Sequence, residues 1–198
     1  MAPSRSEAHA DFANSLLLPL GRIEEAVRES RAATAVDPLS SESHYRLANV
    51  LISAGRYEEA VTNCALMAAD NPARSWCLGR ARIGQGRIDE AIQILEAAMN
   101  RGVSPGSQVR GELGYAYAWA GRRDQAEQFA AVTPPINPFN KALIYAGLGD
   151  KDRTFAALDL AAASGPFRIG RALTYPEFAL LKGDSRVSAL RRKVGLPE

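Results

Sequence analysis

The sequence predicts an all-α solenoid of stacked helix pairs, and three observations support this. A heptapeptide of the form Gly-Arg-X-acid-acid-Ala-hydrophobic begins at Gly21, Gly55 and Gly86. Weaker copies begin at Gly121 and Gly149, so that successive glycines are 34, 31, 35 and 28 residues apart. A period near 34 residues indicates units that stack on their neighbours. The 46% hydrophobic and 23% charged content is typical of a folded globular chain.

Each copy of the heptapeptide marks a turn between two helices. Its glycine permits the backbone conformation that ends the first helix, and its acidic residues favour the N-terminus of the second. Its alanine is expected where two helices approach closely. These alanines are Ala26, Ala60, Ala91 and Ala126. Because the acidic pairs return in successive units, we interpret them as helix-opening residues rather than as a catalytic acid/base pair.

The first three units follow one plan. Their helices are expected at 7–20 and 22–36, at 42–54 and 56–70, and at 73–85 and 87–100. The second helices of the first two units end before Pro38 and Pro72, because a residue that precedes proline disfavours the helical region. Ser40 or Ser41 is expected to cap the next helix.

The regular pattern weakens after residue 131. The remaining helix pairs are expected at 108–120 and 122–131 and at 139–148 and 150–164, after loops at 101–107 and 133–138. Irregular or extended backbone is expected at 167–173. Thr174 and Glu177 have the spacing of a capping box, which would open a short helix to Lys182. Asp184 is expected to cap a last helix that ends near Val194.

On this frame the units resemble tetratricopeptide repeats. The family positions of the second unit fall on His44, Leu47, Ala48, Leu51, Ala60, Cys64, Met67 and Pro72. The resemblance covers about residues 7–166, with units at about 7–40, 41–71, 72–106, 107–134 and 135–166. It implies a right-handed superhelical solenoid of about five antiparallel helix pairs. Residues 167–198 are expected to form an irregular segment and capping helices, because the end unit of a solenoid needs a cap.

The C-terminal half carries a narrower resemblance. The stretches 114–123, 142–152 and 175–197 are similar to the tetratricopeptide tails of bacterial multidomain signalling proteins. In those proteins the array follows a winged-helix DNA-binding domain, a nucleotide cyclase or a kinase. This resemblance implies an alternative function, namely a regulatory, sensory or self-association tail of a transcription regulator or cyclase.

The family resemblance implies a bacterial scaffold for protein–protein interaction and not an enzyme. Such a scaffold binds a peptide in the concave groove that the first helices line. The candidate groove residues are Tyr45, Asn49, Trp76, Arg80, Tyr115 and Trp119. Aromatic side chains supply contact area, and Asn or Arg can pair with a peptide backbone or carboxylate. An alternative stays open, in which the chain's own C-terminal segment fills this groove.

The remaining expectations concern partners and compartment. A net charge of +2 argues against broad nucleic-acid binding, and no apolar run has the length of a membrane-spanning helix. Neither a metal nor a cofactor is expected, since the sequence has no Cys/His cluster and no phosphate-binding loop. A cytoplasmic location follows as the default. The first helix has no cap before it, which favours a homodimer through that helix or a missing upstream unit.

The two cysteines allow two readings. Cys64 and Cys77 both fall at apolar positions of helical patterns. We expect two buried free thiols, and a single disulfide bond is the alternative. Two cysteines are too few for a disulfide framework.

Overall fold

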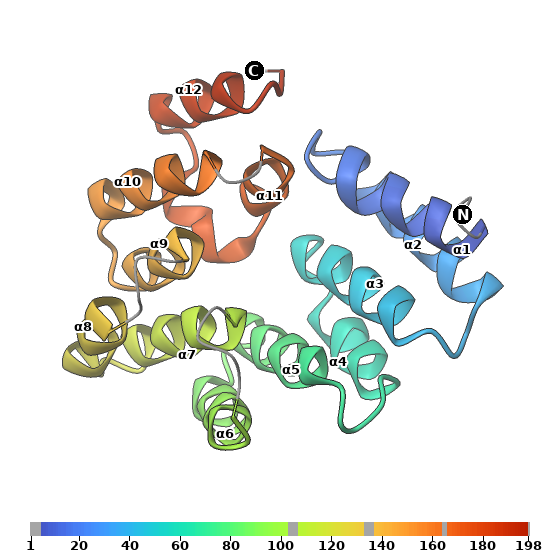
Figure 1. The fold of residues 1–198 in the computed structure, drawn as a ribbon, viewed down its shortest axis with the longest axis horizontal. Helices are drawn as coiled ribbons and strands as arrows, with labels where there is room; N and C mark the ends of the chain where they lie inside the picture. The colour runs from blue at the N-terminus through green and yellow to red at the C-terminus, as the bar shows by residue number, and fades with distance from the viewer. Residues whose placement is uncertain (1–4, 103–106, 133–136, 164–165, 198) are drawn as a thin grey trace.

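The computed structural model describes residues 5–102, 107–132, 137–163 and 166–197, and every element in them is helical (Figure 1). The first three units contain α1 (Arg5–Asp11) with η1 (Phe12–Leu17), α2 (Ile23–Val36), α3 (Ser41–Ser53), α4 (Tyr57–Ala65), α5 (Pro72–Gly84) and α6 (Ile88–Asn100). The rest of the chain contains α7 (Gln108–Trp119), α8 (Arg123–Val132), α9 (Pro138–Gly147), α10 (Lys151–Ala162), α11 (Pro166–Ala172), η2 (Pro176–Leu181) and α12 (Ser185–Lys193). This confirms the predicted all-α class.

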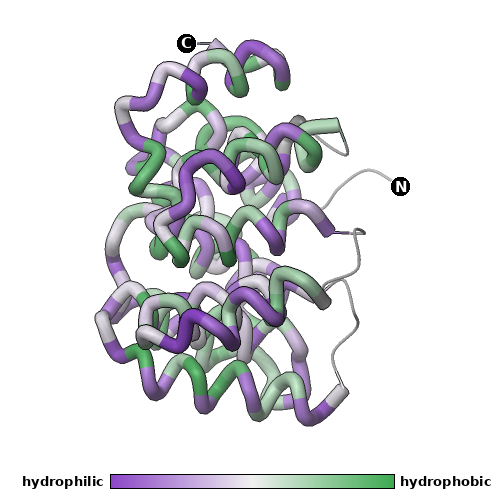
Figure 2. The backbone as a smooth tube through the Cα atoms, turned by 90° about the vertical axis from the view of Figure 1, so that its left-hand side faces the viewer, coloured by the Kyte–Doolittle hydropathy of each residue, from purple (hydrophilic) through white to green (hydrophobic). Residues whose placement is uncertain are grey.

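The helices form antiparallel pairs that stack along an arc. The first helices α3, α5, α7 and α9 pack on one another along the inner side, and α4, α6 and α8 lie outside them (Figure 1). Hydrophilic and hydrophobic stretches alternate along the helices, as expected for amphipathic helices that bury one side (Figure 2). The arc therefore presents one concave side, built mainly from first helices.

The heptapeptide forms the turn that the sequence predicts. The glycines that open its three clearest copies, Gly21, Gly55 and Gly86, have φ values of +75°, +72° and +75°. The residue after each glycine donates its N–H back to the preceding helix, as Arg56 does to the Leu51 carbonyl at 2.9 Å. The alanines of the motif are fully buried. The second helices begin one residue later than expected, because the motif arginine is the N-cap.

The two cysteines are not the free thiols that we expect from the sequence. Cys64 in α4 and Cys77 in α5 form a disulfide bond, with their Cα atoms 5.9 Å apart. Both are buried. The helix α4 has 9 residues, whereas α2 has 14 and α6 has 13. The bond therefore ties the end of a short second helix to the next unit. A pattern of apolar positions could not reveal this, since thiols and disulfides both suit a core.

Two expectations for the C-terminal region are wrong. Residues 167–173 are largely helical, because Ile169 and Ala172 lie one turn apart and bury one face of α11. The predicted capping box does not form. Tyr175 is the N-cap of the 3-10 helix η2, and the Glu177 carboxylate reaches Arg80 instead. The cap at Asp184 is confirmed, since its side chain accepts the N–H of Arg186 at 3.0 Å.

The C-terminal elements return to the first unit. The helix α11 packs against η1, and a Cβ atom placed on Gly170 would lie 2.8 Å from Pro19 Cβ. Arg191 Nη1 lies 3.5 Å from the Pro19 carbonyl oxygen. The two ends of the array are therefore in contact, and η2 lies inside the arc (Figure 1). The centres of the predicted loops, at 103–106 and 133–136, fall outside the described residues.

Candidate functional site on the concave side

The six side chains predicted to line the groove lie on α3, α5 and α7, and they fall into two groups. Five are wholly or partly buried, namely Asn49, Trp76, Arg80 and Tyr115, with Tyr45 half-buried. Trp119, at the end of α7, is 60% exposed. The chain's own C-terminal segment, residues 175–181, reaches the buried group through Tyr175 and Glu177. At this place the groove is filled.

Arg80 forms a carboxylate clamp at the centre of the concave side. Its Nε donates to Glu177 Oε1 at 2.8 Å, and its Nη2 donates to Glu177 Oε2 at 3.0 Å. Its Nη1 donates to Asn49 Oδ1 at 2.9 Å. The exposed fractions of Arg80 and Glu177 are 1% and 3%. A planar guanidinium matches a carboxylate in this two-bond geometry, so the site is built to hold one carboxylate.

Aromatic rings enclose the guanidinium of Arg80. Its Cζ lies 4.1 Å from the ring centroid of Tyr175 and 4.8 Å from that of Trp76. Tyr45 packs on Trp76 with their ring centroids 5.4 Å apart. Cation–π contacts of this kind strengthen when water is excluded. The C-terminal segment thus supplies both a carboxylate and a ring to Arg80.

A second carboxyl group faces the same arginine. Glu112 of α7 is fully buried, and its Oε1 lies 3.2 Å from Arg80 Nε. The Nε–H is directed to Glu177, and neither oxygen of Glu112 has a hydrogen-bond partner among the described residues. Burial and then the charge of Glu177 raise the pKa of Glu112 to about 8, although Arg80 and then the side chain of Trp76 oppose them. At neutral pH, Glu112 is therefore mainly protonated beside the hydrogen-bonded pair of Arg80 and Glu177.

Trp119, at the C-terminal end of α7, is the predicted groove residue that is open to solvent. The ring of Trp119 packs on that of Tyr115, with centroids 5.9 Å apart. Burial raises the pKa of Tyr115, and the charges of Glu177 and Glu112 raise it further, so this phenol stays neutral. Trp119 is thus the candidate that solvent, or another molecule, reaches most freely.

Two family models described as tetratricopeptide repeat match the sequence, one over residues 15–74 and one over 83–149. Together they span more than half of the chain. The chain belongs to the tetratricopeptide-repeat family. This agrees with the period, the turn glycines and the buried motif alanines of the structure.

Solved tetratricopeptide-repeat (TPR) structures share the fold. TTC0263 of Thermus thermophilus is 22% identical with a TM-score of 0.62, over 85% of this chain and 98% of that one. PilF of Pseudomonas aeruginosa is 18% identical with a TM-score of 0.53, over 86% of this chain and 81% of that one. No curated protein matches the sequence. Likeness at these identities shows the fold alone, so the site must be argued from this chain's own residues.

The sequence did not predict three residues of this TPR site, namely Glu112, Tyr175 and Glu177. Glu112 stands alone as an acid in an otherwise apolar stretch of α7, and that isolation was the one available signal. Tyr175 and Glu177 gave no signal of their own, because the local pattern favoured a capping box. The contact between Arg80 and Glu177 joins residues 97 positions apart, which no local pattern reveals.

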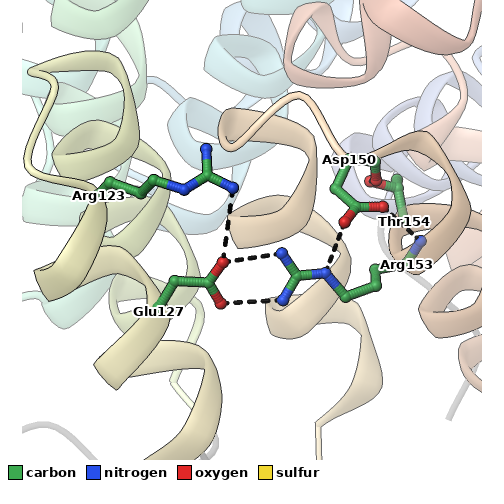
Figure 3. A network of polar contacts seen from close by, with 5 residues as sticks. All are labelled: Arg123, Glu127, Asp150, Arg153 and Thr154. Atoms are coloured by element: carbon green, nitrogen blue, oxygen red, sulfur yellow. Dashed lines mark hydrogen bonds and ion pairs between the residues drawn. The ribbon is translucent and has the colours of Figure 1, made fainter.

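The charged residues of the motif lie on the outside of the TPR array and pair with one another. Figure 3 shows one such cluster, in which Arg153 of α10 donates to both oxygens of Glu127 in α8, at 2.8 and 2.9 Å. Its Nε donates to Asp150 at 2.7 Å, and Asp150 also caps α10. Similar pairs join Arg56 to Glu24 and Arg87 to Glu90. The Arg153–Glu127 and Arg56–Glu24 pairs connect neighbouring helices, whereas the Arg87–Glu90 pair lies within the first turn of α6.

Two further classes of site are absent from the part of the chain that the structure describes. Within it, no three His, Cys, Asp or Glu side chains gather so as to hold a metal ion. Among the same residues, no helix combines the length and the apolar character needed to cross a bilayer.

Proposed function

We propose that this TPR chain is a non-catalytic scaffold that binds a segment of another protein on its concave side. The observation that supports the proposal is the clamp at Arg80, where a guanidinium flanked by two aromatic rings binds a carboxylate in a buried groove. These groups are the ones that recognise an acidic peptide. Tyr45, Asn49, Trp76 and Arg80 would contact the acidic part, and Trp119, whose ring packs on the buried Tyr115, would extend the surface to solvent.

Site-specific photo-crosslinking tests this surface. A benzoylphenylalanine in place of Trp119 should trap a partner from a lysate of the native host, because that side chain is 60% exposed at the end of α7. A matched control carries the same probe in place of Leu66, which is 64% exposed at the end of α4. Equal trapping at both positions, or trapping only at Leu66, would contradict a concave binding surface.

Self-association is the second candidate, and the first unit provides its observation. Phe12 and Leu16 lie four residues apart in η1 and are 44% and 48% exposed. An exposed apolar pair on an end helix favours a homodimer through that helix. Light scattering of the Phe12→Ser, Leu16→Ser variant tests it. A wild-type mass that stays monomeric over a hundredfold concentration range would exclude the dimer.

The alternative of a regulatory tail makes a different prediction. A tail of a winged-helix regulator or a nucleotide cyclase would bind such a domain, so its crosslinks should join Trp119 to that class of protein. None of these three candidate functions includes direct binding of this chain to nucleic acid. A cytoplasmic location stays a prediction, and the Cys64–Cys77 bond speaks against it because cytosolic proteins rarely retain disulfides.

A further inference from the structure

The contact between Arg80 and the C-terminal segment has the composition of a bound ligand. Residues 175–181 bring an aromatic ring, a proline and a carboxylate to the groove in the order Tyr175, Pro176, Glu177. The carboxylate makes two hydrogen bonds to Arg80, and the ring of Tyr175 stacks on the same guanidinium. The segment is joined to α5 through these side chains, across 97 residues of sequence.

Glu112 reduces the free-energy cost of releasing Glu177 from Arg80. Breaking a buried ion pair is normally very unfavourable, because one charge stays behind without a partner. Here Arg80 already has a second carboxyl group within 3.2 Å of its Nε, and the oxygens of that group have no other hydrogen-bond partner in the described residues. If Glu177 withdraws, Glu112 can release its proton and pair with Arg80. The site is thus equipped to lose Glu177 without leaving Arg80 alone.

We propose that residues 175–181 are a displaceable internal ligand of the Arg80 clamp, and that the clamp accepts a partner's acidic segment in their place. The partner segment would carry an aromatic ring two residues before a Glu or Asp, as this chain does. The exchange is coupled to Glu112, which is protonated when Glu177 is bound and ionised when the clamp is vacant. This inference rests on the proposed scaffold function and names the partner chemistry of the same groove.

The other ionisable groups near the clamp lie on α3, α4, α7 and α11, beside Tyr175 of the segment itself. Tyr45 on α3, Tyr57 on α4 and Tyr115 on α7 feel the charges of Arg80 or Glu177, and burial raises the pKa of each. These phenols therefore stay neutral near pH 7. Arg171 on α11 lies close enough for its charge to act on Tyr45. Glu112 is the group in this set that changes charge between pH 6 and 9.

Apolar contacts oppose the displacement of residues 175–181, so the test of the proposal is whether this segment opens locally. Phe178 and Leu181 are buried in a cluster with α9 and α10. The segment must therefore open locally, with the regular helices still folded. Amide hydrogen exchange of the wild-type chain measures this directly. The amides of residues 177–181 should exchange at least about tenfold faster than those of α5 and α7, since local opening needs less free energy than global unfolding.

The pH dependence identifies Glu112 as the coupled group. Below about pH 8 the opening constant should rise with pH by up to about tenfold per unit, after correction for intrinsic exchange, because opening releases one proton. In the Glu112→Gln variant this rise should vanish. If the amides of 177–181 exchange only at the rate of α5, or if the rise persists without Glu112, the proposal is overturned.

Peptide competition tests the ligand. A fluorescein-labelled peptide with the sequence of residues 173–182 is titrated into the full chain. It should bind the Glu177→Gln chain about tenfold or more tightly than the wild type, because the internal competitor has lost its charge. A peptide with Gln at the position of Glu177 should bind neither chain. Equal affinity of both chains for the acidic peptide would reject displacement. The crosslink at Trp119 would be unaffected by that result, so the scaffold function is judged separately.

Discussion

Several clusters among the described residues bring one arginine against two carboxyl groups, and the clusters at Arg153 and Arg80 differ in behaviour because only the second is buried. On the outside, Arg153 pairs with Glu127 and Asp150, whose side chains are 36% and 32% exposed (Figure 3). Hydrogen bonds from Arg153 lower the pKa of both carboxyls, so that both are ionised at neutral pH. Water screens the two negative charges from each other.

On the concave side the same composition yields a different charge state. Arg80 meets Glu177 and Glu112 with all three side chains buried. Burial and then the charge of Glu177 raise the pKa of Glu112 to about 8, because one arginine does not offset two buried carboxylates. The outer cluster therefore resembles an ordinary surface ion pair, whereas the inner cluster keeps one proton bound to the Glu112 carboxyl. Charge composition alone does not set the role of a polar cluster.

Removal of each arginine should expose this difference most strongly. Arg80→Met leaves Glu177 buried without its cation, and we expect a loss of about 3–5 kcal/mol in the free energy of unfolding. Arg153→Met should lower it by at most about 1 kcal/mol, as for exposed pairs. Urea denaturation followed by circular dichroism measures both. Similar losses for the two variants would contradict the distinction between the clusters.

The disulfide bond offers a second large change that involves no charge. Reduction of Cys64–Cys77 should lower the free energy of unfolding by about 3 kcal/mol, the value expected for a loop of similar length. Because the bond ties α4 to α5 and bears no proton, the pH dependence of stability should stay unchanged. Urea denaturation with and without a phosphine reductant, at pH 6 and pH 8, checks this, and mass spectrometry after alkylation counts the thiols. A reduced protein with an altered pH profile would show that the inner cluster depends on the bond.

The repeat, the turns and the close helix contacts could be predicted from the sequence, because each depends on residues that lie close together in the chain. The turn glycine and the motif alanine recur at fixed spacing, and each is required by its own turn or helix crossing. The same local character explains why α12 and its cap at Asp184 were predictable. The groove-facing positions of Trp76 and Arg80 followed from the resemblance to the family.

The sequence did not predict that residues 175–181 cover those positions. Thr174 and Glu177 satisfied a local capping pattern, yet Glu177 gains more from a buried arginine 97 residues away. Long-range pairing of this kind overrides a local propensity. For α11, Gly170 and the preceding proline weakened the helical signal, while burial of Ile169 supplies the stability of the helix. The site therefore needed three-dimensional packing to be recognised.

A pH titration should separate the clusters by the sign of their effect. Glu112 has a pKa of about 8 in the folded chain against an ordinary 4.5, so its contribution is fully present below 4.5 and is lost as the pH rises towards 8. The folded-state pKa values of Glu127 and Asp150 are lowered, so their contribution is lost in acid, as the pH falls through those values. Thermal denaturation from pH 3 to pH 9 should therefore give a wild-type Tm that falls above pH 5.

The Glu112→Gln variant sharpens this measurement. Its Tm should be nearly flat between pH 5 and pH 8, because the amide cannot ionise. Its acid limb should match that of the wild type, since the outer cluster is intact. A Tm that still falls above pH 5 in this variant would assign the alkaline loss to a group other than Glu112.

Salt should give the smallest effect and should act on one cluster alone. Arg153 is 39% exposed, so its pairs with Glu127 and Asp150 are partly screened, and 1 M NaCl should remove most of their contribution of at most about 1 kcal/mol. The destabilisation by Arg153→Met should then shrink towards zero, as the double-mutant cycle with Glu127→Gln can measure. The loss caused by Arg80→Met should persist in salt, because ions do not enter the buried groove. If high salt rescued both variants equally, the inner cluster would have to be open to solvent, and neither its stored proton nor its displaceable ligand could then be maintained.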